Sequence, residues 1–377
     1  MRKEAVRLVE DLLAIPTPNP PGANYAAMVD ALERVLRDWD VPVRRFDPPG
    51  VPPSSRTNLI ATWGSGRRTL HFHGHYDVVP VFREEQFVPR RQEGRLYGRG
   101  SADMKGGLVA MLLALRVLQG TGLPDGGRLI LTLVPDEETG GTYGTAALLT
   151  AGLEVQGGAG MLMPEPTGGV IWHACRGALT VEITVRGRPA HVGMAAEGVN
   201  AFEGMVRAAG AVLALKGRVA ARHGTMLVGG RTGGGASFNV VPDRCWFTVD
   251  RRFEPSEGLN LARQEIMDAL DGVRREGVDI EVTVLQEAPA AAVPLESPLI
   301  RTLAGVIAEV TGRPPRVEPC PGVLEIRFFA QRGVPAVCYG PGDLEVSHGP
   351  EEYVEMERIL QTAAIYAETT LRMLAPR

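Results

Sequence analysis

The sequence has few cysteines, no long hydrophobic run and no block of charge of one sign. Its four cysteines show no paired spacing, which argues against a disulfide framework and favours a reduced, cytoplasmic setting. The longest apolar stretch, around Leu108–Leu115, ends at Arg116 and is too short to cross a bilayer. A formal net charge of −4 gives no reason to expect a nucleic acid or a membrane surface as a partner.

Internal repeats and low-complexity segments are also missing from the sequence. The first 13 residues have the charged, amphipathic pattern of a helix and lack the uninterrupted apolar core of a signal peptide. With 44% hydrophobic and 22% charged residues, the composition is that of an ordinary soluble globular protein. A length of 377 residues is sufficient for two domains.

Up to about residue 175, short apolar runs alternate with helical patterns. An apolar run precedes His75, a helical pattern covers Leu108–Leu118, and a second apolar run covers Leu129–Pro135. This alternation predicts an α/β fold with a largely parallel sheet. In such sheets, ligands gather beyond the carboxyl ends of the strands.

The pattern changes after Gly177. Strands are predicted at 180–185, 226–230, 245–249 and 280–285, and helices at 200–215 and 257–270. The order β-α-β-β-α-β is that of an open-faced sandwich with two helices on one face of a sheet. We therefore expect an inserted domain at 177–288. The first domain would comprise 1–176 and 289–377, with further helices at 300–310 and 351–374 and a strand before Gly340.

Five side chains of metal-binding type follow predicted strands or a glycine-rich turn. They are His75, Asp103, Glu138, Glu165 and His348. Four lie at or beyond a strand end, whereas Asp103 precedes a helix. Carboxylates combined with two imidazoles suit zinc, cobalt or manganese. The set predicts one site for two divalent ions, with a bridging carboxylate that holds them about 3.5–4 Å apart.

Each of these signals has an ordinary structural alternative. His75 and Asp77 could form a surface turn, and Asp103 could cap a helix N-terminus. Glu137 and Glu138 could belong to a solvated acidic turn, but the strongly apolar run before them argues against it. If the site is real, Glu137 is an acid beyond the ligand count, as a hydrolase needs for its general base.

His71 and His73 lie on the same face of the predicted strand as His75. We assign them to packing or to support of the site rather than to metal ligation.

Several ordered motifs resemble one enzyme family. They are G-H-Y-D-V-V-P at 74–80, L-Y-G-R-G-S-A-D-M-K-G-G at 96–107, D-E-E-T-G-G at 136–141, E-P-T at 165–167, G-R-P-A-H at 187–191, N-V-V-P-D at 239–243 and D-R-R at 250–252. The chain resembles the dinuclear metallohydrolases that include acetylornithine deacetylase, succinyl-diaminopimelate desuccinylase, aminoacylase and glutamate carboxypeptidase. The resemblance covers almost the whole chain.

The resemblance implies a role for each candidate ligand. His75 and Glu165 would bind one metal ion, Glu138 and His348 the other, and Asp103 would bridge the two. Zinc is the expected metal, with cobalt or manganese as alternatives. Asp77 would orient His75, and Glu137 would be the general base. The resemblance also implies a cis peptide between Asp103 and Met104.

The same resemblance implies roles for the inserted domain. His191 would stabilise the oxyanion in the site of the partner subunit, which requires a homodimer formed through residues 177–288. Arg252 would bind a substrate carboxylate, for which its planar guanidinium is well suited. Asn239 would help to position the substrate.

The expected substrate is a small N-acyl amino acid, from which the enzyme removes the acyl group. A metallo-carboxypeptidase acting on short peptides or glutamate conjugates is the alternative, and a non-catalytic metal-bound binding protein is a third reading. Glu165 resembles the deacylase and carboxypeptidase branches, since di- and tripeptidase branches tend to carry aspartate there.

One stretch departs from the family pattern: Leu324 replaces a small polar residue, and Glu325 replaces aspartate.

Overall fold

The computed structural model describes residues 1–153 and 158–376. The chain forms two compact units, each described here by itself. Unit 1 comprises Met1–Ala174, Ala292–Pro319 and Glu325–Arg377, and unit 2 comprises Cys175–Ala291 and Cys320–Leu324. None of the helices within the described ranges is long and apolar enough to cross a membrane.

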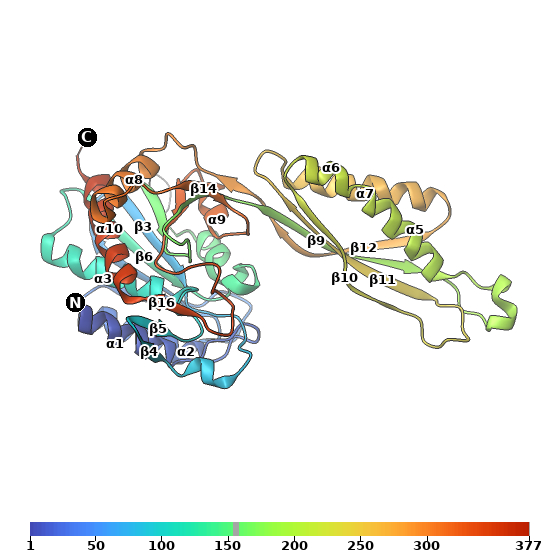
Figure 1. The fold of residues 1–377 in the computed structure, drawn as a ribbon, viewed down its shortest axis with the longest axis horizontal. Coiled ribbons are helices and arrows are strands. Elements are labelled where there is room, and N and C mark those ends of the chain that lie inside the picture. Colours follow the sequence, from blue (N-terminus) through green and yellow to red (C-terminus); the bar gives the residue numbers. More distant parts are fainter. Residues whose placement is uncertain (154–157, 377) are drawn as a thin grey trace. The chain divides into compact units, whose positions relative to one another are not determined.

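A nine-stranded sheet forms the centre of unit 1 (Figure 1). Its strands run in the order β1 (Val43–Phe46), β2 (Asn58–Gly64), β6 (Gly127–Val134), β3 (Arg68–His75), β7 (Gly160–Met163), β15 (Ala336–Cys338), β8 (Ile171–Cys175) and β13 (Ala291–Ala292), while β14 (Val317–Cys320) pairs with β8. The four central strands, from β6 to β15, are mutually parallel, and antiparallel strands flank them. The expected α/β fold with a largely parallel sheet is confirmed.

Helices cover this sheet and bury its apolar strands. They are α1 (Arg2–Leu13), α2 (Tyr25–Asp38), α3 (Lys105–Thr121), α4 (Ala147–Thr150), α8 (Pro298–Thr311), α9 (Ile326–Ala330) and α10 (Met356–Leu374). α10 packs against both α3 and α8, and α3 is buried along almost its whole length. Central strands covered in this way are buried on both faces, and β3 is indeed buried from Thr69 to His75 and β6 from Leu129 to Val134.

The last helix corrects one expectation. A helix was expected from Glu351, but α10 begins at Met356 and is preceded by β16 (Tyr353–Glu355). β16 pairs with β5 (Arg95–Tyr97), which pairs with β4 (Arg90–Gln92) in a small antiparallel sheet. Tyr353 lies opposite Tyr97, so a cross-strand aromatic pair overrides the helical pattern at this point.

Unit 2 is a four-stranded antiparallel sheet in the order β10 (Thr225–Gly234), β11 (Arg244–Phe253), β9 (Gly177–Arg186) and β12 (Asp279–Ala288). α5 (Ala201–Leu213) and α7 (Leu259–Arg275) lie on one face of it (Figure 1). The chain order agrees with the predicted sequence of strands and helices, apart from the extra short helix α6 (Lys216–Ala221).

Alternating side chains build the core of unit 2. Leu179, Val181, Ile183 and Val185 of β9 are all buried, and they pack with buried residues of α5 and α7. On α7, Leu270 is fully buried, whereas Leu261 is 42% exposed on the opposite side of the helix. The burial pattern therefore follows the helical period.

We predict that Leu270→Ala lowers the free energy of unfolding by about 2–5 kcal/mol, because it removes a fully buried side chain and leaves a cavity. Leu261→Ala on the same helix should change it by no more than about 0.5 kcal/mol. Urea unfolding followed by circular dichroism measures both. Equal effects of the two substitutions would contradict the described packing of α7.

Candidate metal centre

The five candidate ligands come from loops at one edge of the unit 1 sheet. β3 ends at His75, β6 is followed by Glu138, β7 is followed by Glu165, and β15 is followed at a greater distance by His348. These four strands are parallel neighbours, so their carboxyl ends meet at the same edge. Asp103 is contributed by the turn before α3, and its peptide bond to Met104 is cis, as expected.

Asp103 lies at the middle of the cluster. Its Oδ1 is 3.2 Å from Nε2 of His75, and its Oδ2 is 3.3 Å from Nε2 of His348. Glu165 Oε1 is 3.9 Å from the same nitrogen of His75. On the other side, Glu138 Oε2 is 3.4 Å from Nε2 of His348. The carboxylate of Asp103 therefore lies between two pairs, His75 with Glu165 and His348 with Glu138.

The donor set fits divalent cations. Ligand atoms of His75, Asp103 and Glu138 lie within 4.8 Å of one another. Oε1 of Glu138 and Oε1 of Glu165 are buried and accept no hydrogen bond from the residues that the structure describes. Buried carboxylates normally have partners, so these two oxygens are suited to bind a cation. Oxygen and imidazole donors together suit zinc and related ions.

The pKa values of the cluster also indicate that its carboxylates need positive charge beside them. Hydrogen bonds to Asp103 and Glu138 raise the pKa of His348 to about 10. Burial lowers the pKa of His75, but hydrogen bonds to Asp103 and Asp77 outweigh it and leave the pKa well above the usual value. Burial also raises the pKa of Glu138, although the hydrogen bond from His348 partly offsets this. In the absence of cations, protons would supply the positive charge.

Asp77, two residues after the end of β3, contacts both His75 and the turn that carries Glu137 and Glu138. Nδ1 of His75 lies 3.0 Å from its carbonyl oxygen and 3.4 Å from its carboxylate. The same carboxylate accepts hydrogen bonds from the backbone N–H groups of Glu137 and Glu138, each at 3.2 Å, and from Nδ2 of Asn19 at 2.8 Å. Asp77 thus orients both the imidazole and the acidic turn. No pattern in the sequence singles out Asn19.

Glu352 and Arg99 form a second support that the sequence does not reveal. Oε1 of Glu352 accepts hydrogen bonds from the backbone N–H groups of Gly100, Ala102 and Asp103 at 3.0–3.1 Å. Its Oε2 lies 2.5 Å from Nη1 of Arg99, and both side chains are buried. Nη2 of Arg99 donates to the carbonyl oxygen of His348 at 3.2 Å. One ion pair therefore holds the turns that carry two candidate ligands.

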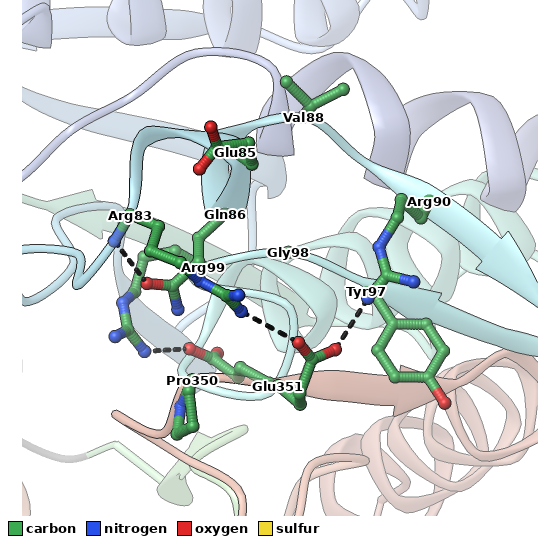
Figure 2. A pocket seen from close by; sticks show the side chains of 11 residues that line it. Arg83, Glu85, Gln86, Val88, Arg90, Tyr97, Gly98, Arg99, Pro350 and Glu351 are labelled. Atoms are coloured by element: carbon green, nitrogen blue, oxygen red, sulfur yellow. Dashed lines mark hydrogen bonds and ion pairs between the residues drawn. The ribbon is translucent and has the colours of Figure 1, made fainter.

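Arg99 also lines a cavity of about 510 Å³ on the outer side of this ion pair (Figure 2). Arg83 and Arg90 reach Glu351 across this cavity, at 3.0 and 2.7 Å, and their side chains are about half exposed. The candidate ligands do not line this cavity.

The remaining predicted residues belong to unit 2. His191 is exposed and is held near Asn239 by a bridge between His191 and Val240 and by a hydrogen bond from Val192 N to Asn239 O. Arg252 lies on β11, where its guanidinium makes two hydrogen bonds to Asp250 at 2.6 and 2.9 Å. The structure thus brings His191 and Asn239 together at one end of the sheet.

The two other histidines of β3, which were expected to serve packing or support of the site, are fully buried. Burial lowers the pKa of His71 to about 3, so this imidazole is neutral. His73 lies 2.9 Å from Glu325, one of the two residues that depart from the family pattern. Glu325 is completely buried.

The fold and the cluster together define a metal-dependent hydrolase that acts on amide bonds. The chain belongs to Peptidase family M20/M25/M40, whose model matches residues 71–372. Succinyl-diaminopimelate desuccinylase of Cereibacter sphaeroides is 30% identical, over 97% of this chain and 98% of that protein. The resemblance noted in the motifs is confirmed.

Solved structures share the fold over nearly the whole chain. A tripeptidase from Staphylococcus aureus has a TM-score of 0.82 at 19% identity, covering 99% of each chain. A dinuclear metal-binding peptidase of the same family from Bacillus subtilis has a TM-score of 0.72 at 16% identity, covering 99% of this chain and 98% of that one.

We predict that metal binding releases protons and strengthens as the pH rises towards about 10. His348 has a pKa of about 10 in the metal-free protein, so at pH 8 a cation must displace its proton. Calorimetric titration of the apo-protein with zinc, in buffers of different ionisation enthalpy, counts the protons released. His348→Ala should release fewer. A heat that is independent of the buffer would contradict the protonated apo-site.

We further predict that Glu352→Ala weakens metal binding about 10- to 100-fold, because the turn that carries Asp103 loses its acceptor. Glu351→Ala removes the neighbouring carboxylate, which is exposed, and should leave the affinity unchanged. Chelator competition measures both affinities, and Glu352→Gln serves if the alanine variant does not fold. Equal affinities for the two alanine variants would argue against the support role.

Proposed function

We propose that this chain is an amidohydrolase that removes the acyl group from an N-acyl amino acid, as acetylornithine deacetylase and succinyl-diaminopimelate desuccinylase do. The observation that carries the proposal is the position of Asp103, with one oxygen towards His75 and the other towards His348. A carboxylate in this position is suited to bridge two cations. The 30% identity to a desuccinylase over nearly the whole chain supports the choice of a deacylase.

In this proposal, His75 and Glu165 hold one divalent ion, Glu138 and His348 hold the other, and Asp103 is shared. Zinc is the expected metal, and cobalt or manganese are alternatives with the same donor preference. When bound, the ions would lower the pKa of a water molecule towards about 7 and polarise the scissile carbonyl. The free oxygens of Glu138 and Glu165 support this assignment.

Glu137 is the proposed general base. Its backbone N–H is held by Asp77, so the adjacent Glu138 can face the metal cluster while Glu137 remains available. Burial raises its pKa well above the usual value, and the charges of Glu165 and Glu138 raise it further. The ionised carboxylate of Glu137 would accept a proton from water, and a raised pKa makes it a stronger base for this step and lets it hold the proton until the leaving amine takes it.

The inserted domain, residues 177–288, is proposed to complete the site and to form a homodimer, while 1–176 and 289–377 form the catalytic domain. His191 would stabilise the oxyanion in the partner subunit's site, Asn239 would position the substrate, and Arg252 would bind its carboxylate. The exposure of His191 leaves it free to do so.

Exposed apolar side chains on α5, namely Phe202, Val206 and Leu213, support a dimer interface on this helix. A cytoplasmic location, expected from four cysteines that show no paired spacing in the sequence, belongs to the same proposal.

A carboxypeptidase remains the second candidate, because deacylation and removal of a C-terminal residue both cut an amide beside a carboxylate. Apo-protein reloaded with zinc, cobalt or manganese should be tested on N-acetyl, N-succinyl and N-formyl amino acids and on short peptides. Metal-restored turnover of one acyl class would support the deacylase. Turnover of peptides alone would favour the carboxypeptidase, and no turnover with two ions bound would favour a binding protein.

We predict that Glu137→Gln binds metal as the wild type does but loses at least about 100-fold in kcat, since general acid–base catalysis contributes about 10²- to 10⁴-fold. Metal content by elemental analysis and kcat on the best substrate of the panel check this. Glu318→Gln, on β14, removes an exposed carboxylate of the same unit and serves as the control. Comparable turnover of Glu137→Gln and the control would rule out Glu137 as the base.

A further inference from the structure

The turn at residues 136–141 carries both the proposed base and a proposed ligand. Its backbone is unusual: Asp136, Gly140 and Gly141 all have left-handed φ values, of 77°, 110° and 75°. A non-glycine residue such as Asp136 is costly in this conformation and persists only where its surroundings impose it. From inside, Asp77 holds the turn through the backbone N–H groups of Glu137 and Glu138.

A second set of contacts holds the turn from the opposite side, and it comes from residues 325–327. Nη2 of Arg327 donates to the carbonyl oxygen of Gly140 at 2.8 Å. Oε1 of Glu325 lies against Gly141 so closely that a Cβ atom there would be 2.4 Å away. Glycine at 141 is therefore required both by its φ value and by this carboxylate.

The carboxylate of Glu325 is itself fixed by His73. Oε2 of Glu325 lies 2.9 Å from Nε2 of His73, and Nδ1 of His73 lies 2.6 Å from Oγ1 of Thr132. Oγ1 of Thr145, just beyond the turn, is 2.8 Å from the same Nε2. A carboxylate oxygen accepts, so in the bond to Glu325 the proton is carried by Nε2 of His73. Glu325, His73 and both threonines are buried.

We propose that Glu325, fixed by His73, and Arg327 are positioning residues that brace the turn and aim Glu137. The catalytic consequence rests on the function proposed above, whereas the brace itself does not. Glu325 is buried between His73 of β3 and Gly141 of the turn. It therefore fixes the distance between the turn and β3.

The brace also accounts for the departure from the family pattern at residue 325. Aspartate is one methylene shorter than glutamate, so from the same backbone position its carboxylate would lose either the contact with Gly141 or the hydrogen bond to His73. The longer side chain in this chain matches a histidine on β3, two residues before His75. The length of the side chain at residue 325, rather than its charge, is therefore the property that these contacts need.

The test compares Glu325→Ala, Glu325→Asp and Glu325→Gln. Hydrogen exchange of the metal-loaded protein, read by mass spectrometry, reports the turn without any substrate. Alanine and aspartate should speed exchange within 137–146 by at least about tenfold, because the turn loses the carboxylate that packs against Gly141 and is anchored on His73. Glutamine keeps both the reach and an oxygen that accepts from Nε2 of His73, so it should restore slow exchange. Glu309→Gln, in an exposed ion pair of the same unit, is the control.

Kinetics then separates positioning from folding. With metal content unchanged, Glu325→Ala and Glu325→Asp should lower kcat about 10- to 100-fold while KM stays nearly constant, and Glu325→Gln should recover most of kcat. Wild-type exchange in the aspartate variant would overturn the proposal. An equal rise of exchange in α3 would overturn it too, because the effect would then be global. If the wild type hydrolyses no amide, the proposed function fails, while the exchange data still decide whether the brace exists.

Discussion

Crowded negative charge is the constraint on which the centre of unit 1 depends. Asp103, Glu138 and Glu165 place carboxylates around two imidazoles at one edge of the sheet, and Glu137 adjoins them. Buried carboxylates at this spacing repel one another unless cations or protons lie between them. Burial, and after it the charges of neighbouring carboxylates, raise the pKa values of Glu137 and Glu165, and hydrogen bonds to Asp103 and Glu138 raise the pKa of His348. The neighbouring turns are held by hydrogen bonds that prevent the ligands from moving apart.

Three side chains hold these turns in a similar way. Asp77, Glu352 and Glu325 are buried carboxylates outside the ligand set, and each acts on a turn rather than on a metal. Asp77 and Glu352 accept backbone N–H groups next to ligands, whereas Glu325 presses on a glycine. A loop that is fixed at its backbone presents its side chain in one orientation, as the proposed two-ion site needs.

The sequence was informative where its pattern has a fixed period or place. The apolar run before His75 predicted a central strand, and the rule that ligands gather at strand ends predicted that Glu138 and Glu165 would lie near it. The order of elements in unit 2 followed in the same way from alternating strands such as β9. These inferences depend on local pattern and on sheet geometry alone.

Other features could not be predicted because they depend on pairing between distant segments. Glu352 reaches Asp103 across 249 positions, and Asn19 reaches Asp77 across 58, with no signal in either segment. The helix expected from Glu351 was too long because Tyr353 pairs with Tyr97 in a strand. Glu325 departs from the family pattern in the sequence, and the structure shows it buried against His73, a partner that only the fold brings near.

The spread of the ligands from residue 75 to residue 348 has a consequence for biosynthesis. While the chain emerges from the ribosome, His75, Asp103, Glu138 and Glu165 precede His348, and the whole of unit 2 is made in between. Arg68, at the start of the strand that ends in His75, donates to the carbonyl oxygens of Leu374 and Ala375, so these contacts form only after α10 has been synthesised. A site that needs all five of these side chains can therefore form only after His348 has been synthesised.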